Sequence, residues 1–291
     1  MLRNKFFIPL AIILTAILLI AGINYSLKLT SANNNITSSN VQKSKIIFSD
    51  EFNNKSLDST KWVTCYDWYD ANRQGCSNYG NEELEWYMAS QVKVEKGNLT
   101  LVAAKKEVGG VDKAGNDKTY PYVSGMISTG KSNMQTEPKW VNAYGYYEAR
   151  MSVPGGKGVW PAFWLLPQGL EWPPEIDIME LLGDRPNEIL NTYFWKDQNG
   201  NQAKDSGTYV GDTPYVGGWH VYAVEWQPGA ISWYIDGKKV RDIKSENVPK
   251  IPLEMVLNLA VGGKLPGNPD ASTQFPATMK VDYVRVYNSK P

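Results

Sequence analysis

The chain has 291 residues, and its 30 basic and 30 acidic side chains give a formal net charge of zero. This balance and the absence of any long basic run argue against a nucleic-acid partner. The one histidine, His220, excludes metal centres built from several histidines. His220 lies in the alternating segment WHVYAVEW, which favours a structural role over a catalytic one. Any catalytic groups in this chain are therefore expected to be carboxylates.

The N-terminus is predicted to be an export signal. Arg3 and Lys5 precede an 18-residue apolar run over 6–23, which is long for a signal-peptide core and short for a membrane span. Residues 1–23 are therefore a signal peptide or an N-terminal membrane anchor, and we favour the anchor. Basic residues before the run place the remaining chain outside the cytoplasm. Residues 24–45 are polar and low in complexity, which predicts a disordered linker.

From residue 46 onward, short alternating segments are separated by turn residues. Examples are GNLTLVAA, GYYEARMSV, HVYAVEW, AISWYIDGKKV and MKVDYVRVY. Many short strands without intervening helices predict one all-β domain over 46–291, built as an antiparallel β-sandwich. Asp236-Gly237 predicts a tight hairpin, because a type I′ turn requires positive φ at both central positions. Cys65 and Cys76 could form a disulfide across one loop of an exported chain.

The segment EWPPEIDIMELLG (171–183) places three carboxylates among apolar residues. Alternation along a strand puts Glu175 and Asp177 on one face, whereas Glu180 has the opposite parity. A β-bulge adds one residue to a strand and would bring Glu180 to the same face. We place this bulge at Ile178-Met179, so that all three carboxylates line one groove.

Two glutamates on either side of one point suit the cleavage of a glycosidic bond. A retaining glycosidase uses one carboxylate as nucleophile and another as acid and then base, roughly 5–5.5 Å apart. A third carboxylate between them can raise the pKa of the acid and orient the nucleophile. The alternative is a calcium site, but calcium loops take their ligands from flexible turns rather than from an isoleucine-rich strand.

The segment EIDIME resembles the active-site strand of glycoside hydrolase family 16, in the bulged E-x-D-x-x-E form of its laminarinase-like members. Other segments resemble the family in family order, and together they cover essentially residues 46–291. They lie at 48–62, 79–87, 94–107, 122–129, 144–167, 219–240, 257–263 and 275–287.

The resemblance implies a jelly roll of the concanavalin A type, with two curved sheets and a concave glycan-binding cleft. It implies that Glu175 is the nucleophile, Asp177 the assisting carboxylate and Glu180 the general acid/base. The positions that line the cleft in relatives correspond here to Asn81, Glu148, Arg150, Trp160, Trp172 and Asn258. Catalysis is expected to need no cofactor. A structural calcium, as in some relatives, would involve Glu51, the carbonyl of Gly97 and Asp282.

The chain departs from the family pattern just after the active-site strand. Laminarinase-like members often continue with His-Gly-Thr-x-His-aromatic, whereas this chain reads LNTYFW. Leu190 and Phe194 stand where the two histidines would be, so the site gains apolar surface and loses two hydrogen-bonding side chains.

The resemblance implies a retaining endo-β-glucanase that hydrolyses β-1,3-glucan of the laminarin type, and mixed β-1,3/1,4-glucan as a second substrate. The alternatives are a transglycosylase, a hydrolase of agarose or carrageenan, and a non-catalytic glucan-binding protein. The last class lacks the catalytic glutamates, which this chain has. We expect a monomer outside the cytoplasm, either secreted or tethered to the membrane through residues 6–23.

Overall fold

The computed structural model describes residues 44–66, 75–169 and 171–291. The predicted export signal and nearly all of the predicted linker lie outside these residues. Ser44 and Lys45, the last two residues assigned to the linker, hydrogen-bond to Ser289 and Asn288 near the C-terminus. Ser44–Pro291 is one compact unit. Among the residues described, no helix is long and apolar enough to cross a membrane.

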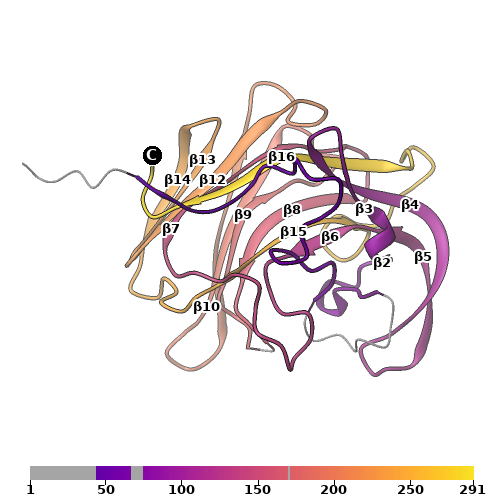
Figure 1. Cartoon of the computed structure of the whole chain (residues 1–291), viewed down its shortest axis with the longest axis horizontal. Helices are drawn as coiled ribbons and strands as arrows, with labels where there is room; N and C mark the ends of the chain where they lie inside the picture. The colour runs from indigo at the N-terminus through magenta and orange to yellow at the C-terminus, as the bar shows by residue number, and fades with distance from the viewer. Residues whose placement is uncertain (1–43, 67–74, 170) are drawn as a thin grey trace, which may run out of the picture. The chain divides into compact units, whose positions relative to one another are not determined.

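The unit consists of two β-sheets (Figure 1). The larger sheet has ten strands, ordered β14-β13-β12-β7-β16-β4-β5-β2, with β1 beside β16 and β3 beside β4. Its members are β1 (Ile46–Asp50), β2 (Glu85–Tyr87), β3 (Val92–Glu95), β4 (Asn98–Val111), β5 (Asp117–Ser124), β7 (Gly145–Ser152), β12 (His220–Gln227), β13 (Ala230–Ile235), β14 (Lys238–Lys244) and β16 (Ala277–Tyr287). Its pairs are antiparallel except β2 with β5, which is parallel.

The smaller sheet has six strands in the order β11-β10-β9-β8-β15-β6, all antiparallel. These are β6 (Met126–Ser128), β8 (Val159–Leu166), β9 (Glu175–Glu180), β10 (Glu188–Lys196), β11 (Gln202–Val210) and β15 (Glu254–Val261). Two short 3-10 helices, η1 (Tyr79–Asn81) and η2 (Ala89–Gln91), flank β2. The predicted antiparallel β-sandwich is confirmed.

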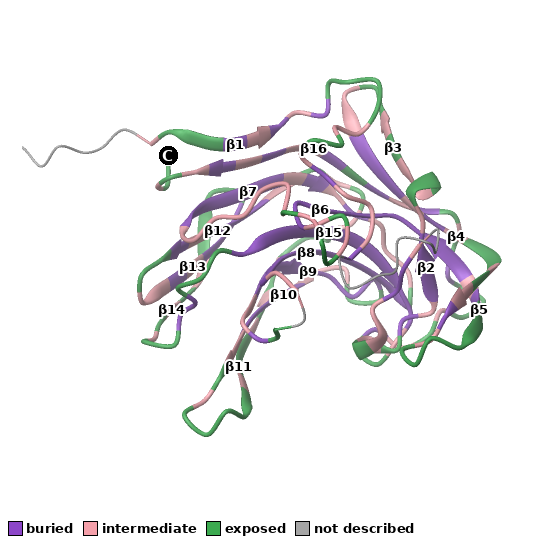
Figure 2. Cartoon of the chain, turned by 60° about the horizontal axis from the view of Figure 1, so that its bottom comes forward, coloured by how far each residue is buried: buried purple, intermediate pink, exposed green. Residues whose placement is uncertain are grey.

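The main core lies between the two sheets, because residues from both contribute to one buried apolar cluster. Alternation decides which side chains enter it. On β7, Tyr147, Ala149 and Met151 are buried in this cluster, and the residues between them point to the other face. The strands β8, β9 and β15 are buried along nearly their whole length (Figure 2). Burying each large apolar side chain stabilises the fold by about 1.5–3 kcal/mol, which makes this sandwich a firm support for a site.

A second buried cluster covers part of the outer face of the six-stranded sheet. Ala162 and Trp164 on β8 and Val256 on β15 pack there against residues from the segment before and including β2. The disulfide expected between Cys65 and Cys76 is present, and both cysteines pack in or against this cluster. The cover leaves the β9, β10 and β11 side of this face outside the cluster.

The predicted hairpin is also confirmed. Asp236 and Gly237 join β13 to β14 and have φ angles of +50° and +77°. His220 on β12 contacts this turn, since its Nδ1 lies 2.8 Å from Oδ2 of Asp236. His220 therefore has the structural surroundings that its alternating segment suggested.

Candidate active site

Strand β9 carries the three carboxylates and contains a bulge. Opposite β9 on β10, Thr192 pairs with Asp177 and Leu190 pairs with Glu180. Between these pairs, Ile178 and Met179 of β9 lie opposite the single residue Asn191 of β10. The register against β8 shifts at the same place. The bulge lies at Ile178-Met179, as predicted from the parity of the carboxylates.

The bulge sorts the side chains of β9 between two faces. The apolar residues enter the main core; these are Ile176, Ile178 and Met179. Glu175, Asp177 and Glu180 then share the opposite face, here called the carboxylate face of the six-stranded sheet. The carbonyl of Ile178 within the bulge accepts a hydrogen bond of 2.7 Å from Nδ2 of the buried Asn191.

Two tryptophans hold the outer two carboxylates. The indole Nε1 of Trp172 donates to Oε2 of Glu175 at 2.7 Å, and Nε1 of Trp160 donates to Oε1 of Glu180 at 3.1 Å. Asp177 lies between the glutamates along the strand and is hydrogen-bonded to Glu175. Each glutamate therefore has one carboxylate oxygen held by an indole N–H.

Burial raises the pKa of all three carboxyl groups. It raises the pKa of Glu175 to about 7, against hydrogen bonds from Trp172 and Asp177 that lower it. Burial and then the charge of Glu175 raise the pKa of Glu180 to about 8, while Trp160 and Lys204 oppose the rise. The pKa of Asp177 is raised well above its usual range by burial and by both glutamates. Of the two neighbouring carboxyls, Asp177 is the one whose protonated form is favoured, and a hydrogen bond donated by Asp177 favours the Glu175 anion.

An aromatic pair lies beside Glu175. The rings of Trp172 and Phe194 are 5.5 Å apart, and Phe194 pairs with Glu175 across β10 and β9. On β11, Lys204 pairs with Phe194 and places its ammonium 5.9 Å from the ring centre. Trp172 is 41% exposed, so part of its indole surface is open to a ligand.

On the other side of the carboxylates, two asparagines belong to one hydrogen-bond network. Asn258 on β15 accepts from Nε1 of Trp164 at 2.7 Å and donates to the hydroxyl of Tyr87 at 2.9 Å. Asn81 donates to Oε1 of Glu83 at 3.0 Å, and Tyr87 donates to Oε2 of the same carboxyl at 3.1 Å. The structure therefore brings Asn81, Asn258, Trp160 and Trp172 to the sheet that bears the carboxylates.

Comparison with known proteins decides the family. Residues 80–285, which include all three carboxylates, match the family described as "Glycosyl hydrolases family 16". The chain belongs to glycoside hydrolase family 16. Members of this family need no cofactor for catalysis.

Relatives and solved structures agree with this membership. The endo-1,3-1,4-beta-glycanase EglC of Rhizobium meliloti is 36% identical over 253 residues, covering 83% of this chain and 51% of the relative. This chain thus spans about half the length of that curated relative. The catalytic domain of an endo-1,3-beta-glucanase (laminarinase) from Thermotoga petrophila superposes with a TM-score of 0.71 at 31% identity. It covers 86% of this chain and 100% of that domain. The endo-beta-1,3-glucanase of Pyrococcus furiosus gives a TM-score of 0.69 at 32% identity, over 84% of this chain and 94% of that one.

Two residues that the family resemblance placed in the cleft lie elsewhere. Glu148 and Arg150 are on β7 of the ten-stranded sheet, on the face that points away from the main core. Nη1 of Arg150 forms an ion pair of 2.7 Å with Asp282, and its guanidinium packs over the ring of Trp219. Glu148 lies near the hydroxyl of Tyr287 at 3.4 Å. The main core separates both residues from the carboxylate face, so the expectation that they line the cleft is corrected.

The proposed calcium ligands are also engaged with other side chains. Both carboxylate oxygens of Glu51 accept from Arg285, at 2.9 and 2.7 Å, and Asp282 pairs with Arg150. Gly97 lies between β3 and β4 with a φ of +73°. Because arginines already neutralise both carboxylates, these three residues as arranged do not fit a calcium ion. The described part of the chain contains no cluster of three or more His, Cys, Asp or Glu residues suited to a metal.

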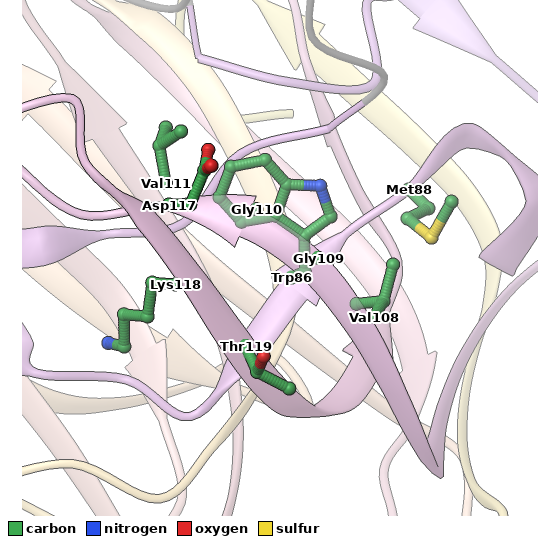
Figure 3. A pocket seen from close by; sticks show the side chains of 9 residues that line it. All are labelled: Trp86, Met88, Val108, Gly109, Gly110, Val111, Asp117, Lys118 and Thr119. Atoms are coloured by element: carbon green, nitrogen blue, oxygen red, sulfur yellow. The ribbon is translucent and has the colours of Figure 1, made fainter.

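A separate pocket of about 630 Å³ lies between β2 and the β4–β5 hairpin (Figure 3). Its lining residues are Trp86, Met88, Val108, Gly109, Gly110, Val111, Asp117, Lys118 and Thr119. None of the three carboxylates of β9 lines it. Gly110 lets the backbone approach Trp86 closely, since a Cβ there would lie 2.6 Å from the indole ring.

Several residues of the site were missed in the sequence. Thr192 and Lys204 reach the carboxylate face because β10 and β11 continue its alternation, a signal that could have been read once β9 was oriented. Glu83 and Glu85 contact the site through Tyr87 and Asn258. Their role depends on a contact between residues over 170 positions apart, which the local sequence does not show.

Proposed function

We propose that the chain is a retaining, endo-acting β-glucanase that cleaves β-1,3 links, with the carboxylate face as its glycan-binding cleft. The observation that carries this proposal is the bulged strand β9, which presents Glu175, Asp177 and Glu180 on one face with a tryptophan donor on each glutamate. The names of the related enzymes, endo-1,3-beta-glucanase and laminarinase, support the β-1,3 linkage.

In the first step, the Glu175 carboxylate attacks the anomeric carbon while Glu180 protonates the departing glycosidic oxygen. The raised pKa of Glu180, about 8, keeps its proton in place at neutral pH. A proton on Asp177 favours the anionic form of Glu175 that the attack needs. The bond from Trp172 stabilises the same anion.

In the second step, Glu180 has lost its proton and acts as a base toward water. The water attacks the anomeric carbon of the glycosyl-enzyme, which breaks its bond to Glu175 and returns the proton to Glu180. Two displacements at one carbon leave its configuration unchanged. Asp177 again donates to Glu175 as the carboxylate leaves.

Binding of the sugar is assigned to the aromatic and amide groups around these carboxylates. The exposed surface of Trp172 suits stacking against the apolar face of a pyranose, and Phe194 extends that surface. Asn81 and Asn258 supply amides for sugar hydroxyls. Leu190 and Phe194 give the cleft apolar surface. Such a surface is compatible with a neutral glucan, which needs no ion pair to bind.

The substrate assignment is tested with the purified protein on laminarin, lichenan, agarose and carrageenan. We expect laminarin to be cut into short oligosaccharides and lichenan, a mixed-linkage glucan, to be cut more slowly. The Rhizobium relative's name, endo-1,3-1,4-beta-glycanase, supports the second activity. Activity on agarose with none on laminarin would reject the proposed substrate.

We also propose that the domain works outside the cytoplasmic membrane. Arg3, Lys5 and the apolar run support export, and a disulfide between Cys65 and Cys76 suits an oxidising compartment. Cell fractionation tests this: full-length protein in the membrane pellet supports an anchor, and a shortened soluble form outside the cell supports a signal peptide. Active full-length protein in the soluble cytoplasm contradicts export.

A further inference from the structure

A chain of buried hydrogen bonds connects the carboxylate face to a pair of glutamates that the proposed reaction does not use. It runs from Trp164 to Asn258, then to the hydroxyl of Tyr87 and then to Oε2 of Glu83. Every side chain in it is at most 8% exposed. Glu85, which is fully buried, is hydrogen-bonded to Glu83.

The direction of each bond is fixed by the indole at one end. An indole nitrogen can only donate, so Asn258 must turn its oxygen to Trp164 and its amino group to Tyr87. The hydroxyl of Tyr87, having accepted from Asn258, has its own proton to donate to Glu83. Oε1 of Glu83 accepts a further bond from Nδ2 of Asn81. Glu83 therefore accepts at both oxygens, which is the behaviour of a carboxylate anion.

Glu85 has the complementary arrangement. Its Oε2 accepts from the backbone N–H of Val261 at 2.7 Å, whereas Oε1 receives no N–H or O–H donor from the described residues. A proton on Oε1 donated to Glu83 satisfies both carboxyls. Burial, followed by the charge of Glu83, raises the pKa of Glu85 well above its usual range. Among the described residues, the other titratable groups facing the pair are Tyr66, Tyr87 and Tyr120, and none of them is a cation.

The network ends beside the reaction centre. Trp164 pairs with Asp177 across β8 and β9, and Asn258 pairs with Ala162, which in turn pairs with Glu180. Once Asn258 is oriented, its second amide hydrogen is the group left for a ligand. For Asn81, one amino hydrogen is used by Glu83, so the other amino hydrogen and the carbonyl oxygen are left.

The bond from Val261 to Glu85 is not the only anchor of the segment. Backbone bonds already hold this segment to the end of β15, from the N–H of Leu84 to Val261 and from the N–H of Lys264 to Asn81. Burying two carboxyl groups without a cation is costly. An arrangement that costs stability and orients two amides at the site favours a functional role.

We propose that Glu83, which accepts at both oxygens while Glu85 donates to it, is a positioning residue that fixes the amides of Asn258 and Asn81 for sugar hydroxyls. This inference rests on the proposed glycosidase function. It also makes the two adjacent glutamates unequal, because one must remain an acceptor and the other must remain a donor.

The test compares Glu83→Gln with Glu85→Gln. A glutamine at 85 still donates to Glu83 and accepts from Val261, so kcat/KM on laminarin should stay within about threefold of wild type. A glutamine at 83 turns an amino group toward one of two donors, and a buried clash of this kind should lower kcat/KM by about tenfold or more. The loss should appear mainly in KM, because the amides bind the substrate. Glu82→Gln is the matched control, since Glu82 is exposed and its carboxylate forms a surface ion pair with Lys264.

A second measurement does not depend on substrate. Protonated Glu85 contributes stability that is present at low pH and is lost as the pH rises. Denaturant unfolding at pH 6 and pH 9 should therefore show a smaller loss with pH in Glu85→Gln than in wild type, and Glu83→Gln should be destabilised at both pH values.

The outcomes separate this inference from the proposed function. Equal losses in both variants, or a wild-type KM in Glu83→Gln, would overturn the positioning role. If laminarin is not hydrolysed even by wild type while the unfolding asymmetry holds, the donor and acceptor order stands and the substrate assignment falls.

Discussion

At the level of single residues, the environments of Glu175 and Glu180 differ in ways that support the different roles proposed for them. Glu175 accepts from Trp172 and from Asp177, so its charged form has two donors. Glu180 has one indole donor and lies near a negative neighbour, which favours its protonated form. A nucleophile and an acid require environments that favour the anion of one carboxyl and the protonated form of the other.

Removal of either glutamate should give a distinct azide product. In Glu180→Ala, azide should attack the glycosyl-enzyme formed from an activated aryl glycoside and give the β-azide. In Glu175→Ala, azide should enter the vacated space and give the α-azide. NMR of the two products measures the anomers directly. An exchange of the two anomers would reverse the assigned roles.

The pH dependence of kcat/KM should follow the same carboxyls. Activity should fall on the alkaline side as Glu180 loses its proton, with a midpoint near its pKa of about 8. It should fall on the acid side as the coupled Glu175 and Asp177 pair takes up a further proton, near the Glu175 pKa of about 7. The leaving group of an activated aryl glycoside departs with little protonation. With such a substrate, the fall of kcat/KM at alkaline pH should therefore be smaller. An unchanged alkaline limb with that substrate would contradict the acid role of Glu180.

At the scale of the elements, the bulge in β9 brings the third carboxylate to the site. Asn191→Ala should remove the donor to the bulged carbonyl of Ile178 and leave a buried acceptor unpaired. We expect a loss of about 1–3 kcal/mol in the free energy of unfolding and a lower kcat. Denaturant titration and laminarin kinetics measure both effects. Thr208→Ala, on the exposed part of β11, is the control. An equal effect of this substitution would show that the hydrogen bond from Asn191 does not specifically stabilise the bulge.

Features that depend on neighbours along one strand could be predicted from the sequence, whereas contacts between distant strands could not. Alternation within EIDIME was sufficient to predict the bulge and the common face, because both depend on neighbours along one strand. Glu148 and Arg150 were misplaced because the segment 144–167 contains β7 and β8, which belong to different sheets. Local sequence does not state which sheet a strand joins. The network of Glu83 depends on a contact with β15, so its residues could be found only in the folded chain.

At the scale of the whole molecule, several buried carboxyls make stability depend on pH. Burial raises the pKa of Glu83, Glu85, Glu175, Asp177 and Glu180 above the values in the unfolded chain. Stability from such groups is fully present below the unfolded pKa and falls as the pH rises. The site is therefore built at some cost to the stability of the fold at alkaline pH.

The free energy of unfolding should thus decrease between about pH 5 and pH 9. A variant with Glu175→Gln, Asp177→Asn and Glu180→Gln should be inactive and should show a weaker decrease. Denaturant unfolding across this range measures the difference. A parallel decrease in the variant and the wild type would show that the catalytic carboxyls do not carry the raised pKa values.

Strand β9 is proposed to carry out a double displacement with Glu175 as nucleophile. The anomeric configuration of the first product that the intact enzyme releases from laminarin, followed by NMR before mutarotation, tests this mechanism. We expect the β-anomer, with the configuration of the substrate retained. An α-anomer formed first would contradict the covalent mechanism and the role assigned to Glu175.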